Sequence, residues 1–221
     1  RQFQFLASHF PDVLSINLTG AASGTLEAAR SAADSVDAVG QMHVINSRNA
    51  SLGQGLLVVF AAECAAAGMT IEATIKRVEA LIPRTRSYGI LRNLDYAVRG
   101  GRVPRWARTV CRLLGITPII VTTGAGRLGL STALLGRGRR IRRFAKHVAR
   151  RARPLGSVCV AIGHADCPDD ALALETELRA NLPSIARLTT TAVGTALGVH
   201  GGPGMLVIAV QPYESPDDAG R

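Results

Sequence analysis

Aromatic residues are scarce in this chain. Phe, Trp and Tyr make up 4% of the 221 residues, although 47% of the residues are hydrophobic. A core with few large rings is filled mainly by Ala, Val, Leu and Ile, as in proteins that pack helices onto sheets through small side chains. The length allows one large domain or two small ones. We therefore expect an α/β fold.

Paired cysteines and long apolar runs are also missing. The four cysteines show no C-x-x-C spacing, so the sequence indicates neither a disulfide framework nor a metal site, and we expect reduced, mostly buried thiols. The longest apolar stretch, residues 55–68, contains Glu63 and is shorter than the about 20 residues that a bilayer requires. It predicts a buried helix. Because no segment resembles a signal peptide, we expect a cytoplasmic location.

The common catalytic and cofactor motifs are absent as well. The sequence contains no G-x-S-x-G, P-loop or H-E-x-x-H motif. Gly124-Ala-Gly126 lacks the third glycine and the acidic residue that dinucleotide binding requires. The histidines are scattered, without a cluster of His, Cys and Asp that would hold a metal. We therefore expect no metal and no cofactor.

Lysine is rare, and arginine supplies most of the positive charge. The net charge is +10, only Lys76 and Lys146 are lysines, and the window 137–153 holds nine basic residues and no acidic one. We predict a helix over 139–153. Such a stripe is typical of a surface that attracts nucleic acid, an anionic membrane or an acidic protein. The alternative is a solvated helix face in a generally arginine-rich chain. We expect no specific nucleic-acid partner, and contact of 137–153 with an anionic membrane is a hypothesis.

Strands and helices alternate along the chain. The apolar run 13–18 predicts a strand, 19–24 a turn-rich loop and 25–34 a helix, and a second unit of this kind begins at residue 43. Such a loop lies at the amino end of a helix, where free N–H groups favour anions, although Ser23 there also suits a simple helix cap. We predict a first domain over 1–91 with a parallel sheet, a second over 92–213 with a mixed sheet, and a mobile tail over 214–221.

One histidine lies in a glycine-rich segment near the end of the chain. Residues 194–204, with His200 in their second half, precede the apolar run 205–210, and we predict a loop followed by a strand. Glycines let the backbone approach a ligand closely, and an imidazole can donate a hydrogen bond to an anionic oxygen. The alternative is that the glycines only shape a tight turn and that His200 has no ligand. This segment alone favours neither.

Five motifs follow one another in the order and spacing of the DegV family. They are Thr19-Gly-Ala-Ala-Ser-Gly-Thr25, Asn46-Ser47 with Ser51-Leu-Gly-Gln-Gly55, Leu94-Asp-Tyr96 with Gly100-Gly-Arg102, Thr117-Pro-Ile119 with Gly126, and Gly198-Val-His-Gly-Gly-Pro-Gly204. From about residue 13 to 210 the chain resembles the bacterial fatty-acid-binding proteins of this family. The resemblance implies two α/β domains with one long-chain fatty acid between them, its acyl chain in an apolar tunnel. It also implies that a separate fatty acid kinase subunit phosphorylates the carboxylate.

The resemblance assigns residues to the carboxylate site. His200, followed by Gly201, matches the histidine of the family's H-x-G-P-G loop, and Thr19 and Gly20 fall where the family has a pair of serines. Ser23 adds a hydroxyl in the same loop. Such donors are needed because the burial of an unpartnered carboxylate is costly.

Two arginines are implied as contacts to the kinase subunit. They are Arg102 of the Gly-Gly-Arg motif and Arg137. The bound fatty acid is the only ligand that the resemblance implies, and the chain itself is expected to be non-catalytic.

The family's opening portion has no counterpart in residues 1–12. Family members begin with a further strand and helix and an early T-S-x-P-S motif, so we expect either that this chain is a fragment or that its first domain is abridged. Its unpaired sheet edge would favour association into a homodimer. Two other functions remain open at this point: a phosphotransfer or small-molecule enzyme on a related fold, and a basic protein that binds nucleic acid or a membrane through 137–153.

Overall fold

The computed structural model describes residues 1–38, 40–101, 103–136 and 138–216. Its helices are α1 (Gln2–Ala7), α2 (Thr25–Asp34), α3 (Leu52–Ala66), α4 (Ile71–Leu81), α5 (Asp95–Arg99), α6 (Arg105–Leu113), α7 (Arg140–Ala152), α8 (Pro168–Asn181) and α9 (Thr195–Gly201). Its strands are β1 (Asp12–Asn17), β2 (Gln41–Asn46), β3 (Arg86–Ile90), β4 (Ile116–Thr122), β5 (Leu128–Leu135), β6 (Val158–His164), β7 (Ile185–Ala192) and β8 (Leu206–Pro212). Short 3₁₀ turns follow α4 and α7, at η1 (Ile82–Arg84) and η2 (Arg153–Leu155).

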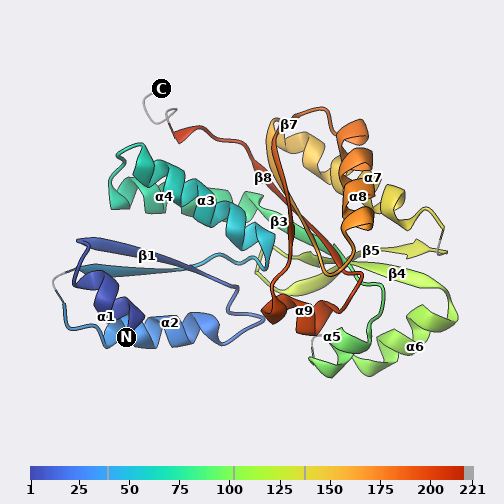
Figure 1. The fold of residues 1–221 in the computed structure, drawn as a ribbon, viewed down its shortest axis with the longest axis horizontal. Coiled ribbons are helices and arrows are strands. Elements are labelled where there is room, and N and C mark those ends of the chain that lie inside the picture. The colour runs from blue at the N-terminus through green and yellow to red at the C-terminus, as the bar shows by residue number, and fades with distance from the viewer. Residues whose placement is uncertain (39, 102, 137, 217–221) are drawn as a thin grey trace.

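The smaller sheet pairs β1 and β2 in parallel, with Asp12 beside Gln41 at its start. Helix α2 forms the connection between the strands, because parallel neighbours need a crossover. Helices α1 and α2 lie on one side of this sheet and α3 and α4 on the other (Figure 1). Leu57 and Cys64 of α3 and Val78 of α4 are 0% exposed in the core of this part. The predicted parallel first sheet is therefore confirmed.

The larger sheet has six strands in the order β5-β4-β3-β8-β6-β7. Strands β6 and β7 are parallel and joined by α8, and all the other neighbours are antiparallel. Helices α7 and α8 pack against this sheet, and Phe144, Leu174, Leu178 and Ile208 are 0% exposed in the shared core. Strand β8, the last described strand, lies between β3 and β6 and is buried along its whole length. The predicted mixed second sheet is thus confirmed.

Local sequence signals explain where α3 ends and α4 begins. Gly68 has φ +78°, a conformation that favours glycine after a helix, and the N–H of Met69 donates to the carbonyl of Cys64 at 3.1 Å. Thr70 then caps α4, because its hydroxyl accepts from the N–H of Ala73 at 3.3 Å. The chain therefore reverses sharply between the two helices.

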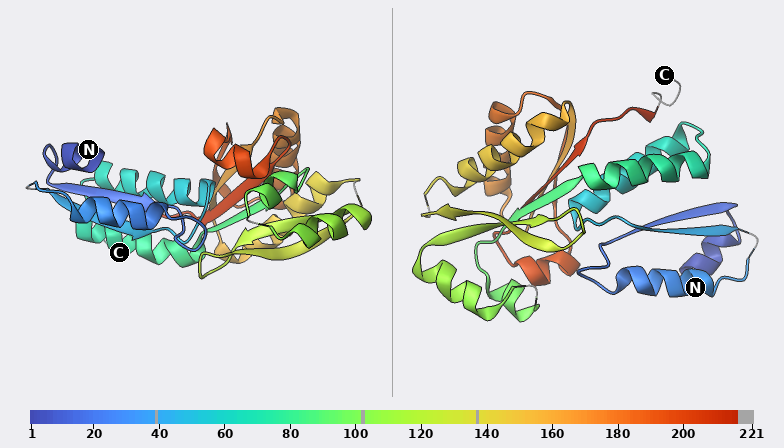
Figure 2. Two further views of the ribbon diagram at one scale, coloured as in Figure 1. Left: turned by 90° about the horizontal axis from the view of Figure 1, so that it is seen from below. Right: turned by 180° about the vertical axis from the view of Figure 1, so that it is seen from behind.

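Helix α3 connects the two sheets. Figure 2 shows the smaller and larger sheets toward opposite ends of an elongated molecule, with α3 reaching the strands of the larger one. The helix contacts β3, β6 and β8. At its start the N–H of Gly53 donates to the hydroxyl of Ser87 on β3 at 3.2 Å. The amino end of α3 is therefore the place where sites shared by both parts can form.

The structure differs from the sequence prediction at several elements. Helix α1 was not predicted, and residues 195–201 form α9 instead of a loop. A boundary near residue 91 would place β3 in the first domain, but β3 pairs with β4 and β8, so the change of sheet precedes Arg86.

The tail that we predicted to be mobile begins with three residues that are tied to α4. Arg77 donates to the carbonyls of Ser215 and Pro216 at 2.8 and 2.9 Å, and Arg84 on η1 pairs with Glu214 at 2.8 Å. Residues 217–221 lie outside the described chain. None of the described helices combines the length and the apolar character needed to cross a membrane.

Candidate functional site

Asn49 is the centre of a buried polar cluster between the two sheets. It is 1% exposed; its Nδ2 donates to the carbonyls of Ser47 and Thr85, both at 3.2 Å, and its Oδ1 accepts from the Thr122 hydroxyl at 3.0 Å. Its own carbonyl accepts from the N–H of Thr19 at 2.9 Å. Buried polar groups are costly unless they are paired, and here every polar atom of the side chain has a partner. The cluster fixes the loop after β2 against β3 and β4.

The loop that carries Asn49 has two residues in an unusual backbone conformation. Arg48 has φ +48° and Ser51 has φ +55° with ψ −129°. Such conformations cost about 1–3 kcal/mol each and persist where the surrounding structure holds them. Sequence reasoning missed this cluster. The one signal was the run of Asn and Ser between residues 46 and 51, which also suits an ordinary turn.

Thr19 joins the same cluster and is 0% exposed. Its hydroxyl donates to the carbonyl of Gly126 at 2.8 Å, which fixes the β1–α2 loop against the turn between β4 and β5. Gly126 has φ +78°, and a Cβ at this position would overlap the Thr19 hydroxyl oxygen. The turn therefore needs glycine for two reasons. For Thr19 to donate to a ligand, its hydroxyl must first leave Gly126.

Gly20 and Ser23 lie in the same loop. Gly20 is exposed, and a Cβ there would come within 2.9 Å of the Leu26 side chain. The hydroxyl of Ser23 lies 2.8 Å from that of Thr25 and accepts from the Thr25 N–H at 3.3 Å. Ser23 thus interacts with the first residue of α2 from the position before the N-cap, which is Gly24, and its hydroxyl remains near the exposed start of that helix.

His200 lies near the end of α9 and is half-buried. Its Nδ1 is buried and has no hydrogen-bond partner within the described chain. The ring lies against Gly100, where any Cβ would overlap Nδ1. Glycine at position 100 therefore permits the close approach, and Nε2 is the ring nitrogen left to meet a ligand. A buried nitrogen without a partner costs about 1–3 kcal/mol, which marks this histidine as unusual.

The glycines after His200 hold the next loop close to α5. Gly201 is buried, and a Cβ there would overlap the sulfur of Met205. Gly202 has φ +69° and lies against the ring of Tyr96, so a side chain at this position is excluded by both strain and space. Gly202 therefore permits the close packing on α5, and Gly201 that on Met205.

The motifs of the sequence analysis come together in two groups. Thr19, the loop with Asn49 and the turn at Gly126 form one group. Residues 96–100 and 200–204 form the other. Within the described chain no hydrogen bond joins Thr19 to His200. The predicted docking residues Arg102 and Arg137 lie outside the described residues.

The predicted basic helix forms, but its charges are partly neutralised. Within α7, Arg140 pairs with Asp170 at 2.9 Å and Arg142 with Glu177 at 3.8 Å, both on α8. His147 is buried, and burial, followed by the charges of Arg151 and Arg150, lowers its pKa. The basic stripe is therefore not a uniformly solvated helix face, because part of its charge is paired with α8 and one of its side chains is buried.

Two hollows open on the described surface. One, of about 570 Å³, is lined by residues of β3, α7 and η2, and the other, of about 560 Å³, by residues of α5, α6 and β4. Neither is lined by Thr19 or His200. Among the described residues no group of three His, Cys, Asp or Glu side chains could hold a metal ion.

Comparison with known proteins gives a consistent result. The family model of the DegV family, described as uncharacterised protein, matches residues 2–213. A DegV domain-containing protein of Caldanaerobacter subterraneus is 32% identical over 201 residues, which cover 91% of this chain and 71% of that protein.

Solved structures show the same fold. One of a DegV family protein from Thermus thermophilus, described by its fatty acid binding, has a TM-score of 0.84 at 22% identity and covers 96% of this chain and 75% of that one. One of a DegV family protein from Ruminococcus gnavus with vaccenic acid has a TM-score of 0.80 at 23% identity, covering 94% and 75%. The α/β fold is thus shared with these proteins.

Proposed function

Because the chain belongs to the DegV family, we propose that it binds one long-chain fatty acid and presents it to a separate kinase subunit. The carboxylate lies at His200 and Gly201, and the acyl chain occupies an apolar tunnel between the two parts of the molecule. The chain is non-catalytic and acts in the cytoplasm, and the kinase subunit forms the acyl phosphate. Its docking contacts are Arg102 and Arg137. The fatty acid is the only ligand required, and a homodimer is compatible with this role.

The unpartnered Nδ1 of His200 is the observation that carries the proposal. An imidazole whose Nδ1 is buried against Gly100 has a fixed orientation, so Nε2–H can be aimed at one position. A carboxylate at that position gains a charge-assisted hydrogen bond, which is stronger than one between neutral groups. Each buried methylene of the tail then adds about 0.8 kcal/mol of binding free energy.

The β1–α2 loop supplies the remaining donors. Gly20 and Ser23 are nearest to the exposed start of α2, where the helix dipole favours an anion. Thr19 contributes by exchanging its bond to Gly126 for one to the carboxylate. Ligand binding would therefore loosen the β4–β5 turn, because one of its anchors is released.

Mass spectrometry of the denatured, purified protein tests the proposal. We expect a co-purified long-chain fatty acid, or binding of added oleate or palmitate, and at least tenfold weaker binding in His200→Ala. His9→Ala is the matched control, because His9 is exposed, follows α1, and lies with its Nδ1 2.7 Å from the carbonyl of Phe5 rather than in either group of motif residues.

Two results would contradict the proposal. If the wild-type chain binds neither oleate nor palmitate, lipid binding is wrong, and if His200→Ala binds as well as wild type, the carboxylate site is wrong. Turnover of ATP by the isolated chain that is lost in His200→Ala would favour an enzyme instead.

A further inference from the structure

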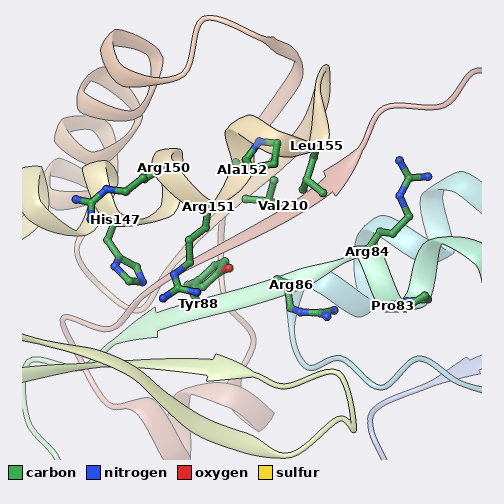
Figure 3. A pocket seen from close by; sticks show the side chains of 11 residues that line it. Pro83, Arg84, Arg86, Tyr88, His147, Arg150, Arg151, Ala152, Leu155 and Val210 are labelled. Carbon is green, nitrogen blue, oxygen red and sulfur yellow. The ribbon is translucent and has the colours of Figure 1, made fainter.

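A hollow of about 570 Å³ lies between α7, η2 and β3 (Figure 3). Its volume is in the range of sites that hold small molecules. Apolar side chains, among them Leu155 and Val210, and the ring of Tyr88 form part of its wall. Four arginines surround it: Arg84, Arg86, Arg150 and Arg151. None of its lining residues comes from α5 or α9, so it is separate from the His200 site.

The positive charge of this hollow is largely uncompensated. Among the described residues that line it, none is acidic. Among the described residues Arg84 pairs with Glu214 at the edge, and Arg86 donates to the carbonyl of the adjacent Thr85 at 2.8 Å. Within the described chain Arg151 has no ion-pair partner. Like charges gathered in this way repel one another, and a bound anion would relieve the repulsion.

Arg86 and Arg151 line the hollow from different elements. Figure 3 shows Arg151 reaching from α7 toward Tyr88, and Arg86 extending from β3 away from that ring, so Arg86 has to turn back from the Thr85 carbonyl to meet a ligand held by Arg151. Burial raises the pKa of Tyr88, while the charges of Arg151 and Arg86 oppose that rise, so both guanidinium groups act on the same phenol. The phenol is protonated at neutral pH and is available as a donor.

The neighbouring histidine adds no charge. Burial and the charges of Arg151 and Arg150 lower the pKa of His147, and its Nε2 lies 2.8 Å from the Ser131 hydroxyl. The imidazole is therefore neutral near pH 7 and is already engaged with β5. The donors that remain for a ligand are the guanidinium groups and the Tyr88 hydroxyl.

We propose that this hollow binds an organic phosphate, with the phosphate between Arg86 and Arg151 and the body of the molecule against Tyr88, Leu155 and Val210. Guanidinium groups match phosphate oxygens in pairs, and a dianionic phosphate neutralises two of them at once. The apolar wall favours an ester over inorganic phosphate, because a bare ion leaves that surface uncovered. The phosphate could belong to a soluble ester or to a lipid headgroup, and both present the same group.

Calorimetric titration of the whole chain tests this site. The probes are inorganic pyrophosphate, AMP as a soluble ester, and vesicles containing phosphatidic acid as a headgroup source. We expect saturable binding of AMP or of the vesicles, about tenfold weaker in Arg151→Gln and roughly a hundredfold weaker when Arg86→Gln is added, since each charged hydrogen bond contributes about tenfold or more. Tyr88→Phe removes only the hydroxyl and should weaken binding several-fold.

Arg105→Gln with Arg127→Gln is the matched control, because it removes the same charge at two exposed positions outside the hollow. Binding within twofold of wild type in this control supports a localised site. AMP binding identifies a soluble ester, and binding of the vesicles alone identifies a headgroup. The proposal is overturned if neither AMP nor the vesicles bind saturably, if pyrophosphate binds more tightly than both, or if the control loses as much affinity as the Arg86 and Arg151 pair. Circular dichroism of each variant shows whether it is folded.

Discussion

Replacement of Asn49 by alanine tests whether the buried polar cluster holds the two sheets together. The substitution removes three side-chain hydrogen bonds, to the carbonyls of Ser47 and Thr85 and from the hydroxyl of Thr122. It also leaves the buried Thr122 hydroxyl without its acceptor, whereas the Thr85 carbonyl keeps its bond from Arg86; Asn49 is 1% exposed, and Thr85 and Thr122 are 0% and 2% exposed.

The expected loss follows from these contacts. A neutral hydrogen bond contributes about 1 kcal/mol to the free energy of unfolding, and a buried group left unpaired costs about 1–3 kcal/mol more. Water that enters the space left by the side chain can bond to some of the unpaired groups and so reduce this cost. We therefore expect the free energy of unfolding to fall by about 3–5 kcal/mol in total. That is a large part of the about 5–15 kcal/mol that stabilises a typical domain.

Urea unfolding followed by circular dichroism measures this loss. With a urea dependence of about 2 kcal/mol per molar, the midpoint should fall by roughly 1.5–2.5 M. Asn93→Ala is the control, because Asn93 is exposed and its side chain bonds only to Asp95 in the described structure, so its loss should cost about 1 kcal/mol or less. A free energy of unfolding for Asn49→Ala within about 1 kcal/mol of wild type would refute the reasoning.

Two further predictions concern stability. Gly126→Ala should lower the free energy of unfolding by about 2–4 kcal/mol, because the new Cβ meets the Thr19 hydroxyl at a positive φ. Gly136→Ala, also at positive φ but in open space, should cost only about 1 kcal/mol. Thermal unfolding measures both variants, and equal decreases in their unfolding temperatures would exclude a clash between the new Cβ and the Thr19 hydroxyl. Because burial and nearby arginines lower the folded-state pKa of His147, its neutral form is stabilising above the unfolded pKa of about 6.5, and stability should fall as pH drops below that value. The urea midpoint should fall between pH 7.5 and pH 5.5, and it should fall less in His147→Gln than in the wild type. An equal fall in the two proteins would show that His147 is not the cause of the pH dependence.

The sequence predicted the alternation of strands and helices but not the buried contacts between distant segments. The run 13–18 and the helix over 25–34 carry their own periodic signals, and β1 and α2 follow them closely. Two of the three side-chain partners of Asn49, Thr85 and Thr122, lie 36 and 73 residues away, and Thr19 meets Gly126 across 107 residues, so no local pattern predicts these contacts. The fold was therefore more accessible to sequence reasoning than the interior of the site.

The error at α9 has a physical cause of the same kind. Glycine costs about 1 kcal/mol in a helix relative to alanine, so a segment with Gly194, Gly198 and Gly201 predicts a loop. In the structure α9 packs on α5, with His200 against Gly100 and Gly202 against the ring of Tyr96, and the N–H of Gly202 closes the helix on the carbonyl of Gly198 at 2.7 Å. Tertiary packing outweighs the local preference, and His200 is consequently held by a helix rather than by a flexible loop.

The central position of β8 has a consequence for synthesis on the ribosome. This strand lies between β3 and β6, yet it is the last described strand to leave the ribosome. Until it emerges, β3 and β6 each lack a neighbour, so the larger sheet can close only after residue 212 is accessible. A chain interrupted before β8 would expose two unpaired central edges, and its main hazard in the cell would be aggregation rather than weak ligand binding.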